Sequence, residues 1–483
     1  MSASRVRTKE RASIGLAAVC AGWFKEVGLQ AEASGLGAVL QQDYARLVAF
    51  LGEHFGTVVA PGVISSVEEA SQALAAFRRA SVDAVVLVHI MWSEDQPLIA
   101  LLEGCNDLPL VLWHYHPTGH LPAFLTTDDL FRRSGTVGAL QGSAVLQRLG
   151  IQPLLVRGTP GDAALGRRLS ELDRALAVRA KVKELAAGRI AGMCEVMTGT
   201  RVDEQALEGQ LGVRLVEISA EEYASACEAV PAERARAFQV QVARAAREVR
   251  VCEESLQLAC RNTLALDVLV AKYGLGVVAI QDLDPELHRL AGTRPCLCPP
   301  VSAEMGVAFG MESDVNATLG LFVAMHASGQ PCMYTEIFSY DPDENVLLMG
   351  HAGVHDPRLA SEAGVHVVPD YEYRLADKWE GAWQEFRLKP GPVTCVSLYD
   401  TGRGYRMTAF EGQSLPGPLR LQGFAHAVIK PDGGVEALLA ELLQLGLTQH
   451  FAVAPGHLVS LLATWCDVSG VEFKQVAAFD GGR

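Results

Sequence analysis

The chain has 483 residues, of which 41 are Lys or Arg and 56 are Asp or Glu, so its formal charge is −15. Nucleic acids and anionic membranes need basic surfaces, so we expect neither as a partner. The 49% hydrophobic and 20% charged residues are typical of a globular protein, and the length allows about three domains.

The 11 cysteines are sparse and odd in number, which argues against a secreted disulfide scaffold. The apolar run at residues 14–21 has the length of a strand, and no stretch reaches the roughly 20 residues that span a bilayer. We therefore expect a cytoplasmic protein.

The first third alternates apolar runs with amphipathic segments, which predicts a parallel, doubly wound sheet. The expected strands are residues 14–21, 57–61, 83–90, 109–115 and 153–157. A Gly-Thr-Pro-Gly sequence at 158–161 indicates a boundary. We expect an N-terminal Rossmann-like α/β domain over residues 1–160.

The middle third predicts a second Rossmann-like domain over 161–330. Its expected elements are helices at 162–187 and, without a break, 232–273, and short strands at 213–218 and 276–280. The last third, 331–483, predicts a β-rich α+β domain. Its expected strands are 333–340, 346–351, 393–398, 405–410 and 419–429, and its expected helices are 434–445 and 458–465.

No Gly-x-Gly-x-x-Gly follows the first strand, where Cys20-Ala21-Gly22-Trp23 stands instead. The α/β pattern therefore gives no support for a nucleotide cofactor. His114 lies at the end of the strand expected at 109–115 and His116 follows it, and α/β folds bind ligands at the carboxyl ends of their strands. These histidines are candidates for substrate binding, and an ordinary polar loop is the alternative.

Two weaker candidates for substrate binding follow apolar stretches elsewhere. Gln281 comes directly after the strand at 276–280, and Met197 follows a short apolar segment. An ordinary loop residue and a core residue are the alternative interpretations.

The segment from 310 to 357 carries the strongest chemical signal. Glu312 precedes an apolar helix, Glu336 lies inside an apolar strand, and His351 ends the next strand. Burying Glu336 is costly unless it is paired or binds a metal, although strand alternation could equally turn it toward solvent. Two carboxylates and an imidazole form a ligand set suited to Mn²⁺ or Mg²⁺.

These motifs resemble the metal-site region of the L-arabinose isomerase and L-fucose isomerase family. The matching segments are Gly310-Met311-Glu312-Ser313-Asp314, Tyr334-Thr335-Glu336-Ile337-Phe338, Gly350-His351 and Gln449-His450-Phe451-Ala452-Val453. The resemblance implies that Glu312, Glu336, His351 and His450 bind Mn²⁺, or another divalent cation such as Mg²⁺ or Co²⁺. It also implies a homo-oligomer, a hexamer or a tetramer.

The resemblance further implies an aldose–ketose isomerase that works through an enediolate, with Glu312 and Glu336 as acid and base. A metal-dependent lyase or epimerase acting on a carbohydrate derivative is the alternative. A non-catalytic sugar-binding protein is a third interpretation, which the complete set of four ligand positions disfavours.

The chain departs from the family at the sugar-binding end. Trp23 and Phe24 stand where the family has small and polar residues, and residues 134–138 lack the family's Gln-x-x-His. We therefore expect a substrate other than L-arabinose, such as a 6-substituted or acidic aldose. Trp23 would contact it, unless it packs in the core, and Arg132 or Arg133 could meet a charged substituent.

Overall fold

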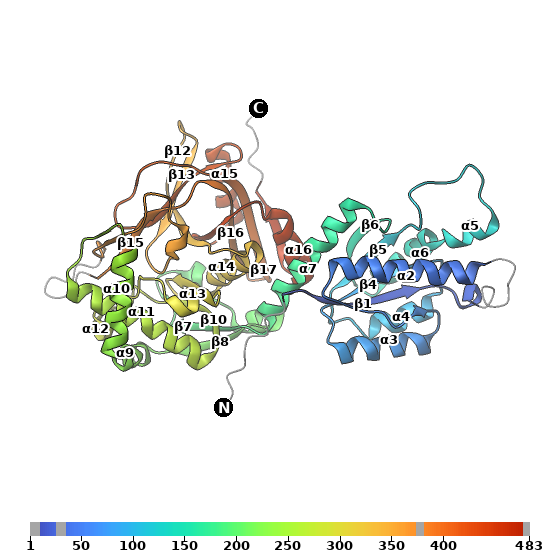
Figure 1. The fold of residues 1–483 in the computed structure, drawn as a ribbon, viewed down its shortest axis with the longest axis horizontal. Helices are drawn as coiled ribbons and strands as arrows, with labels where there is room; N and C mark the ends of the chain where they lie inside the picture. Colours follow the sequence, from blue (N-terminus) through green and yellow to red (C-terminus); the bar gives the residue numbers. More distant parts are fainter. Residues whose placement is uncertain (1–9, 26–34, 373–380, 477–483) are drawn as a thin grey trace. The chain divides into compact units, whose positions relative to one another are not determined.

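The computed structural model describes residues 10–25, 35–372 and 381–476 (Figure 1). They form two compact units. One contains the chain up to residue 180 together with 467–469, and the other contains 181–466 and the chain from 470 onward. The domain boundaries expected at 160 and 330 stay predictions.

The N-terminal unit contains a parallel sheet in the order β2-β1-β4-β5-β6, with β3 also paired to β1. Its strands are β1 (Ser13–Val19), β2 (Thr57–Val59), β3 (Val63–Ile64), β4 (Ala84–His89), β5 (Leu110–Tyr115) and β6 (Leu154–Gly158). Its helices are α2 (Leu36–His54), α3 (Val67–Ala80), α4 (Asp95–Glu103), α5 (Thr127–Arg132), α6 (Gly135–Arg148) and α7 (Ala163–Lys183). Figure 1 shows α2 and α3 on opposite sides of the sheet, as right-handed crossovers require.

The second unit contains a four-stranded parallel sheet in the order β11-β10-β7-β8. Its strands are β7 (Ala186–Ile190), β8 (Arg214–Ile218), β10 (Leu275–Ile280) and β11 (Ala308–Met311). The helices and helical turns around it are η1 (Thr198–Thr200), α8 (Glu204–Ala206), η2 (Leu207–Leu211), α9 (Ala220–Ala229), α10 (Ala232–Ala245), α11 (Glu253–Tyr273), α12 (Pro285–Ala291) and α13 (Pro300–Glu304).

The same unit contains a ten-stranded sheet in the order β20-β17-β16-β19-β12-β13-β18-β15-β14-β9, with a further pairing between β17 and β18. Its strands are β9 (Glu248–Val249), β12 (Met333–Asp341), β13 (Val346–His351), β14 (His366–Val368), β15 (Trp383–Arg387), β16 (Gly391–Asp400), β17 (Tyr405–Ser414), β18 (Ala425–Pro431), β19 (His450–Pro455) and β20 (Glu472–Gln475). The remaining helical elements are η3 (Pro357–Leu359), α15 (Val435–Leu445) and α16 (Val459–Ser469).

Helix α14 (Val315–Ser328) lies between the two sheets of this unit, where it contacts β10 and β11 on one side and β16 and β19 on the other. Nearly all of its side chains are buried, which explains its apolar sequence on every face. A Cβ at Gly320 would lie 3.0 Å from the Cβ of Leu398, so glycine permits the close approach of α14 to β16. The start of α14 therefore faces both sheets at once.

Several predicted elements are wrong in their bounds; for example, the strand expected at 405–410 extends to Ser414, and the helix expected at 458–465 extends to Ser469. The helix expected over 232–273 is two helices, because Glu248 and Val249 leave the helix to pair in parallel with His366 and Val367 of β14. The helix expected at 162–187 ends at Lys183, and the next residues form β7 between β8 and β10. The strand expected at 419–429 begins only at Ala425. Among the described helices, none is long and apolar enough to cross a bilayer.

Candidate metal centre

Strand register brings three of the four predicted metal ligands together. Strand β12 lies between β13 and β19, and Glu336 is paired directly with His450 on one side and with Gly350 on the other. His351 follows Gly350 at the end of β13. The three side chains are therefore neighbours because of pairing in a single sheet.

Glu312 reaches the same point from the parallel sheet. It follows β11 in a tight turn that leads into α14. Both Glu312 and Ser313 have φ of 57°, the left-handed region. The Ser313 N–H donates to the Ile280 carbonyl over 3.0 Å, and the Ser313 hydroxyl donates to the Gly192 carbonyl over 2.5 Å.

The four side chains form one compact cluster. One ligand atom from each of Glu312, Glu336, His351 and His450 lies within 4.8 Å of all the others. His450 Nε2 is 3.1 Å from Glu312 Oε2 and 3.7 Å from Glu336 Oε1, and His351 Nε2 is 3.9 Å from Glu336 Oε2. Glu336 is half-buried and turned toward the cluster, so its alternation does not carry it into solvent.

Asp314 sets the orientation of His450. Its carboxylate lies 2.8 Å from His450 Nδ1 and also accepts a hydrogen bond from the Thr448 hydroxyl over 3.0 Å. Burial disfavours a charged imidazole, but hydrogen bonds to Asp314 and Glu312 outweigh it and raise the pKa of His450 to about 10. His450 Nε2 therefore points at the two glutamates.

The two glutamates differ in their acidity. Burial raises the pKa of Glu336 to about 7, and nearby Glu312 adds to the effect although His450 opposes it. Burial also acts on Glu312, but the hydrogen bond from His450 and the nearby histidines leave its pKa lowered. Glu336 can thus exchange a proton near neutral pH, while Glu312 stays ionised.

His351 offers a free acceptor to the cluster. Its Nδ1 lies 2.8 Å from the Ala352 carbonyl, and its buried Nε2 has no hydrogen-bond partner. Burial, followed by the charge of His450, lowers the pKa of His351 to about 4, so the ring is neutral at pH 7. A buried nitrogen lone pair aimed at two carboxylates fits a divalent cation bound by oxygen and nitrogen ligands.

Sequence reasoning did not find the residues that support this cluster. Asp282 accepts a hydrogen bond from the Glu312 N–H over 2.9 Å, and the Gln449 side chain donates to Glu312 over 3.3 Å. The one available signal was position: Asp282 follows the strand end next to Gln281, and Asp314 begins a helix after Glu312.

Met197 and Gln281, the two weaker candidates for substrate binding, both belong to the larger unit. The Met197 sulfur is 3.1 Å from the Gln449 side-chain nitrogen, and the same nitrogen donates a hydrogen bond to Glu312. Gln281 is buried at the end of β10, and its side-chain oxygen has no partner. Their role in substrate binding stays a prediction.

The remaining substrate candidates belong to the N-terminal unit. Trp23 is 38% exposed and stacks on Phe24 at 4.0 Å between ring centroids, so it is not a core residue. His114 Nε2 lies 3.3 Å from the Thr136 hydroxyl, and His116 Nδ1 contacts the Thr118 carbonyl. Roles for all three in substrate binding stay predictions.

The two arginines considered for a charged substituent have internal partners. Arg132 is bound by both carboxylate oxygens of Asp43, at 2.7 and 2.8 Å. Arg133 donates to the Thr118 hydroxyl over 2.7 Å. Arg132 in particular is already neutralised by a buried acid.

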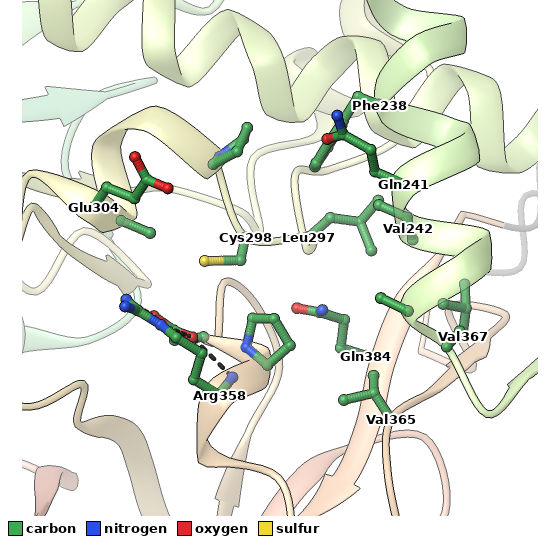
Figure 2. A pocket seen from close by; sticks show the side chains of 16 residues that line it. Phe238, Gln241, Val242, Leu297, Cys298, Glu304, Arg358, Val365, Val367 and Gln384 are labelled. Carbon is green, nitrogen blue, oxygen red and sulfur yellow. Dashed lines mark hydrogen bonds and ion pairs between the residues drawn. The ribbon is translucent and has the colours of Figure 1, made fainter.

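A separate cavity of about 280 Å³ lies between α10 and the strands β14 and β15 (Figure 2). Its lining is mainly apolar, with Phe238, Val242, Leu297, Val365 and Val367, and Figure 2 shows the Gln384 side chain pointing into it. None of the four cluster residues lines this cavity. The four cluster residues therefore form a site that is separate from this cavity.

Comparison with known proteins gives the class of the enzyme. No family model matches the chain. It is 23% identical to the sulfoquinovose isomerases of Priestia aryabhattai and Priestia megaterium over 419 residues, 84% of this chain and 89% of theirs. It is 25% identical to the sulfoquinovose isomerase of Alkalicoccus urumqiensis over 380 residues, 77% of this chain and 81% of the relative. The similarity supports an enzyme of the aldose–ketose isomerase class.

Proposed function

We propose that the chain is a metal-dependent aldose–ketose isomerase that works through an enediolate, and that sulfoquinovose is its first candidate substrate. The observation that carries the proposal is the buried cluster of Glu312, Glu336, His351 and His450 in a chain similar to sulfoquinovose isomerases over most of its length.

The four cluster residues would hold one divalent cation, with Mn²⁺ as the preferred ion. A bound cation would polarise the substrate oxygens at C1 and C2, which makes the C–H bond acidic enough to lose a proton. A cation that binds at His450 Nε2 would displace the proton held there, and the two carboxylates would then balance the charge of the ion, so the site suits a polyhydroxylated substrate.

Glu336 is the proposed proton carrier. Its carboxylate, which burial makes more basic in the ion-free site, would remove the proton from C2 of the aldose and deliver it to C1 of the ketose. A proton passes from the hydroxyl on C2 to the oxygen on C1 in the same conversion, so atoms and charge balance. Glu312, whose pKa is lowered, stays ionised and holds its position.

The substrate proposal agrees with the departures at the sugar-binding end. Sulfoquinovose is a glucose derivative with a sulfonate on C6, and it is therefore both 6-substituted and acidic. Trp23, His114, His116, Met197 and Gln281 are the proposed contacts to the substrate. A homo-oligomer, a hexamer or a tetramer, is the proposed assembly, which light scattering at micromolar concentration measures.

The test is a substrate panel with metal-stripped enzyme and with enzyme reloaded with Mn²⁺. The panel contains sulfoquinovose, glucose, glucose 6-phosphate, L-arabinose and L-fucose, followed by NMR in D₂O. We expect Mn²⁺-dependent ketose formation with deuterium entering at C1, fastest on sulfoquinovose. If kcat/KM is highest on L-arabinose or L-fucose, the assignment of sulfoquinovose as substrate is wrong. Cleavage products would indicate a lyase. Full activity of the metal-stripped enzyme would contradict the proposed metal dependence.

A further inference from the structure

The turn that presents Glu312 is strained. Glu312 and Ser313 are consecutive non-glycine residues with φ of 57°. Such conformations are unfavourable for residues other than glycine and persist only when the surroundings hold them in place. Something outside the turn must therefore fix it.

Asp282 makes a direct contact to this turn. It follows β10, is 1% exposed, and accepts the Glu312 N–H at Oδ1 over 2.9 Å. Its second oxygen, Oδ2, accepts from Arg294 over 2.6 Å. The carboxylate thus links the backbone of a proposed metal ligand to a buried cation.

Arg294 anchors Asp282 from the other side. Its side chain is 0% exposed and is bound also by Asp370, at 2.9 and 3.2 Å, and by Glu372 at 2.5 Å. Its guanidinium carbon lies 4.5 Å from the centre of the Trp383 ring. One guanidinium is therefore shared among three carboxylates, and it remains paired when one of them is removed.

We propose that Asp282, anchored by Arg294, is a positioning residue that holds the Glu312 backbone so that its carboxylate meets the metal site. The proposal rests on the proposed function, because it assigns Asp282 a role through Glu312. A ligand displaced by a fraction of an ångström loses affinity, and partners of metal ligands commonly contribute 10- to 100-fold.

Asp370 provides a matched control. Like Asp282 it is an almost fully buried carboxylate on Arg294, with 2% exposure against 1%. Its hydrogen bonds include those from Arg294 and from the Glu372 N–H over 3.0 Å, whereas the Glu312 N–H donates to Asp282. A purely structural role for the charge cluster predicts equal effects of removing either acid.

The experiment compares Asp282→Ala with Asp370→Ala in the full chain by two measurements. Calorimetric titration with Mn²⁺ measures affinity, and amide hydrogen exchange of residues 308–316 in the metal-free protein measures how firmly the turn is held. We expect Asp282→Ala to weaken Mn²⁺ binding about 10-fold or more and to speed exchange in this segment. Asp370→Ala should change affinity less than about threefold and leave this exchange as in wild type.

Asp282→Asn keeps an oxygen that can accept the Glu312 N–H, and it should fall between wild type and Asp282→Ala in both measurements. It also serves if the alanine variant does not fold. Equal losses in the Asp282 and Asp370 variants, or unchanged affinity and exchange in Asp282→Ala, would overturn the proposal. If wild type binds no Mn²⁺, the proposed function loses its metal, while the exchange data alone still decide the role of Asp282.

Discussion

His450 Nδ1 lies 2.8 Å from Asp314 Oδ2, and both side chains are fully buried. The pair joins two sheets of one unit, since Asp314 begins α14 beside the parallel sheet and His450 begins β19. A carboxylate on the far nitrogen of a metal-binding histidine fixes its tautomer and increases its basicity. Asp314 therefore belongs to the candidate metal centre although it is not one of the four predicted ligands.

We predict that Asp314→Asn weakens Mn²⁺ binding about 10- to 100-fold while the protein stays folded. Asparagine can still cap α14 through the oxygen that accepts the Ala317 N–H over 2.8 Å, but it removes the negative charge opposite His450. Calorimetric titration measures the loss. Thr448→Val removes the hydroxyl that donates to Asp314 and that accepts the His450 N–H over 3.1 Å, but it leaves the negative charge of Asp314 in place, so it should cost less. Equal losses of Mn²⁺ affinity in the two variants would mean that the negative charge of Asp314 does not contribute to ion binding.

We predict that Glu336→Gln folds normally and abolishes turnover. Glutamine keeps the shape of the side chain but cannot carry the proton, so the loss appears in kcat. Circular dichroism checks the fold, and steady-state kinetics on the best substrate of the panel checks the rate. A kcat close to that of wild type would refute the role assigned to Glu336.

Gly310→Ala should destabilise the protein by about 1–3 kcal/mol and weaken Mn²⁺ binding. A Cβ at this position would lie 1.9 Å from the Thr318 hydroxyl oxygen, which itself donates to the Asp314 carbonyl over 2.6 Å. The alanine pushes α14 away from β11 and so displaces the turn at Glu312. Thermal unfolding and titration with Mn²⁺ measure the two effects.

The matched control for this substitution is Gly209→Ala, because a Cβ at Gly209 has no atom within 4 Å and the residue lies inside η2. It should be neutral or slightly stabilising. Adding Thr318→Ala to Gly310→Ala removes the closest clash and should restore part of the stability. Absence of any restoration would argue against the clash as the cause.

Stability should fall with acid because of His89 in the N-terminal unit. This histidine is 2% exposed, and burial lowers its pKa from 6.5 to about 4 although Asp95 opposes the shift. The folded protein keeps the ring neutral, while the unfolded chain takes up a proton below pH 6.5. The stabilisation is therefore complete above pH 6.5 and is lost as the pH falls toward 4.

Between pH 7 and pH 5 this group alone should cost about 2 kcal/mol of unfolding free energy. Calorimetric melting of wild type and His89→Gln at both pH values isolates the contribution. The variant should lose less stability on acidification than wild type. An identical loss in both proteins would show that His89 does not carry this pH dependence.

The main strands of the N-terminal sheet were largely predictable, because runs such as residues 84–89 are apolar throughout and buried on both faces, and in the second parallel sheet β8 and β10 were predicted but β7 and β11 were not. Strand β7 was not predictable, since its sequence Ala-Ala-Gly-Arg-Ile continues a helical pattern and becomes a strand only by pairing with β8 and β10. The break in the helix over 232–273 has the same origin, in a partner strand far along the chain. Local pattern cannot report pairing of this kind.

The four metal-binding candidates could be predicted because their motifs keep a fixed order and residue type, and the structure brings all four together. Asp282 and Arg294 could not, because a buried acid and its arginine look like ordinary loop residues until the fold places them beside Glu312. The residues of the N-terminal unit proposed for substrate binding rest on the sequence alone.

The left-handed turn at Glu312 and Ser313 would make binding of the proposed cation and local opening opposite sides of one equilibrium. If the turn relaxed to an ordinary conformation, the Glu312 carboxylate would move away from His450 and the cation would lose one of its four proposed ligands. Each tenfold excess of ion over its dissociation constant then adds about 1.4 kcal/mol against relaxation of this segment. The unfavourable conformation of these two residues would therefore relax more easily in the ion-free protein than in the protein with a bound cation.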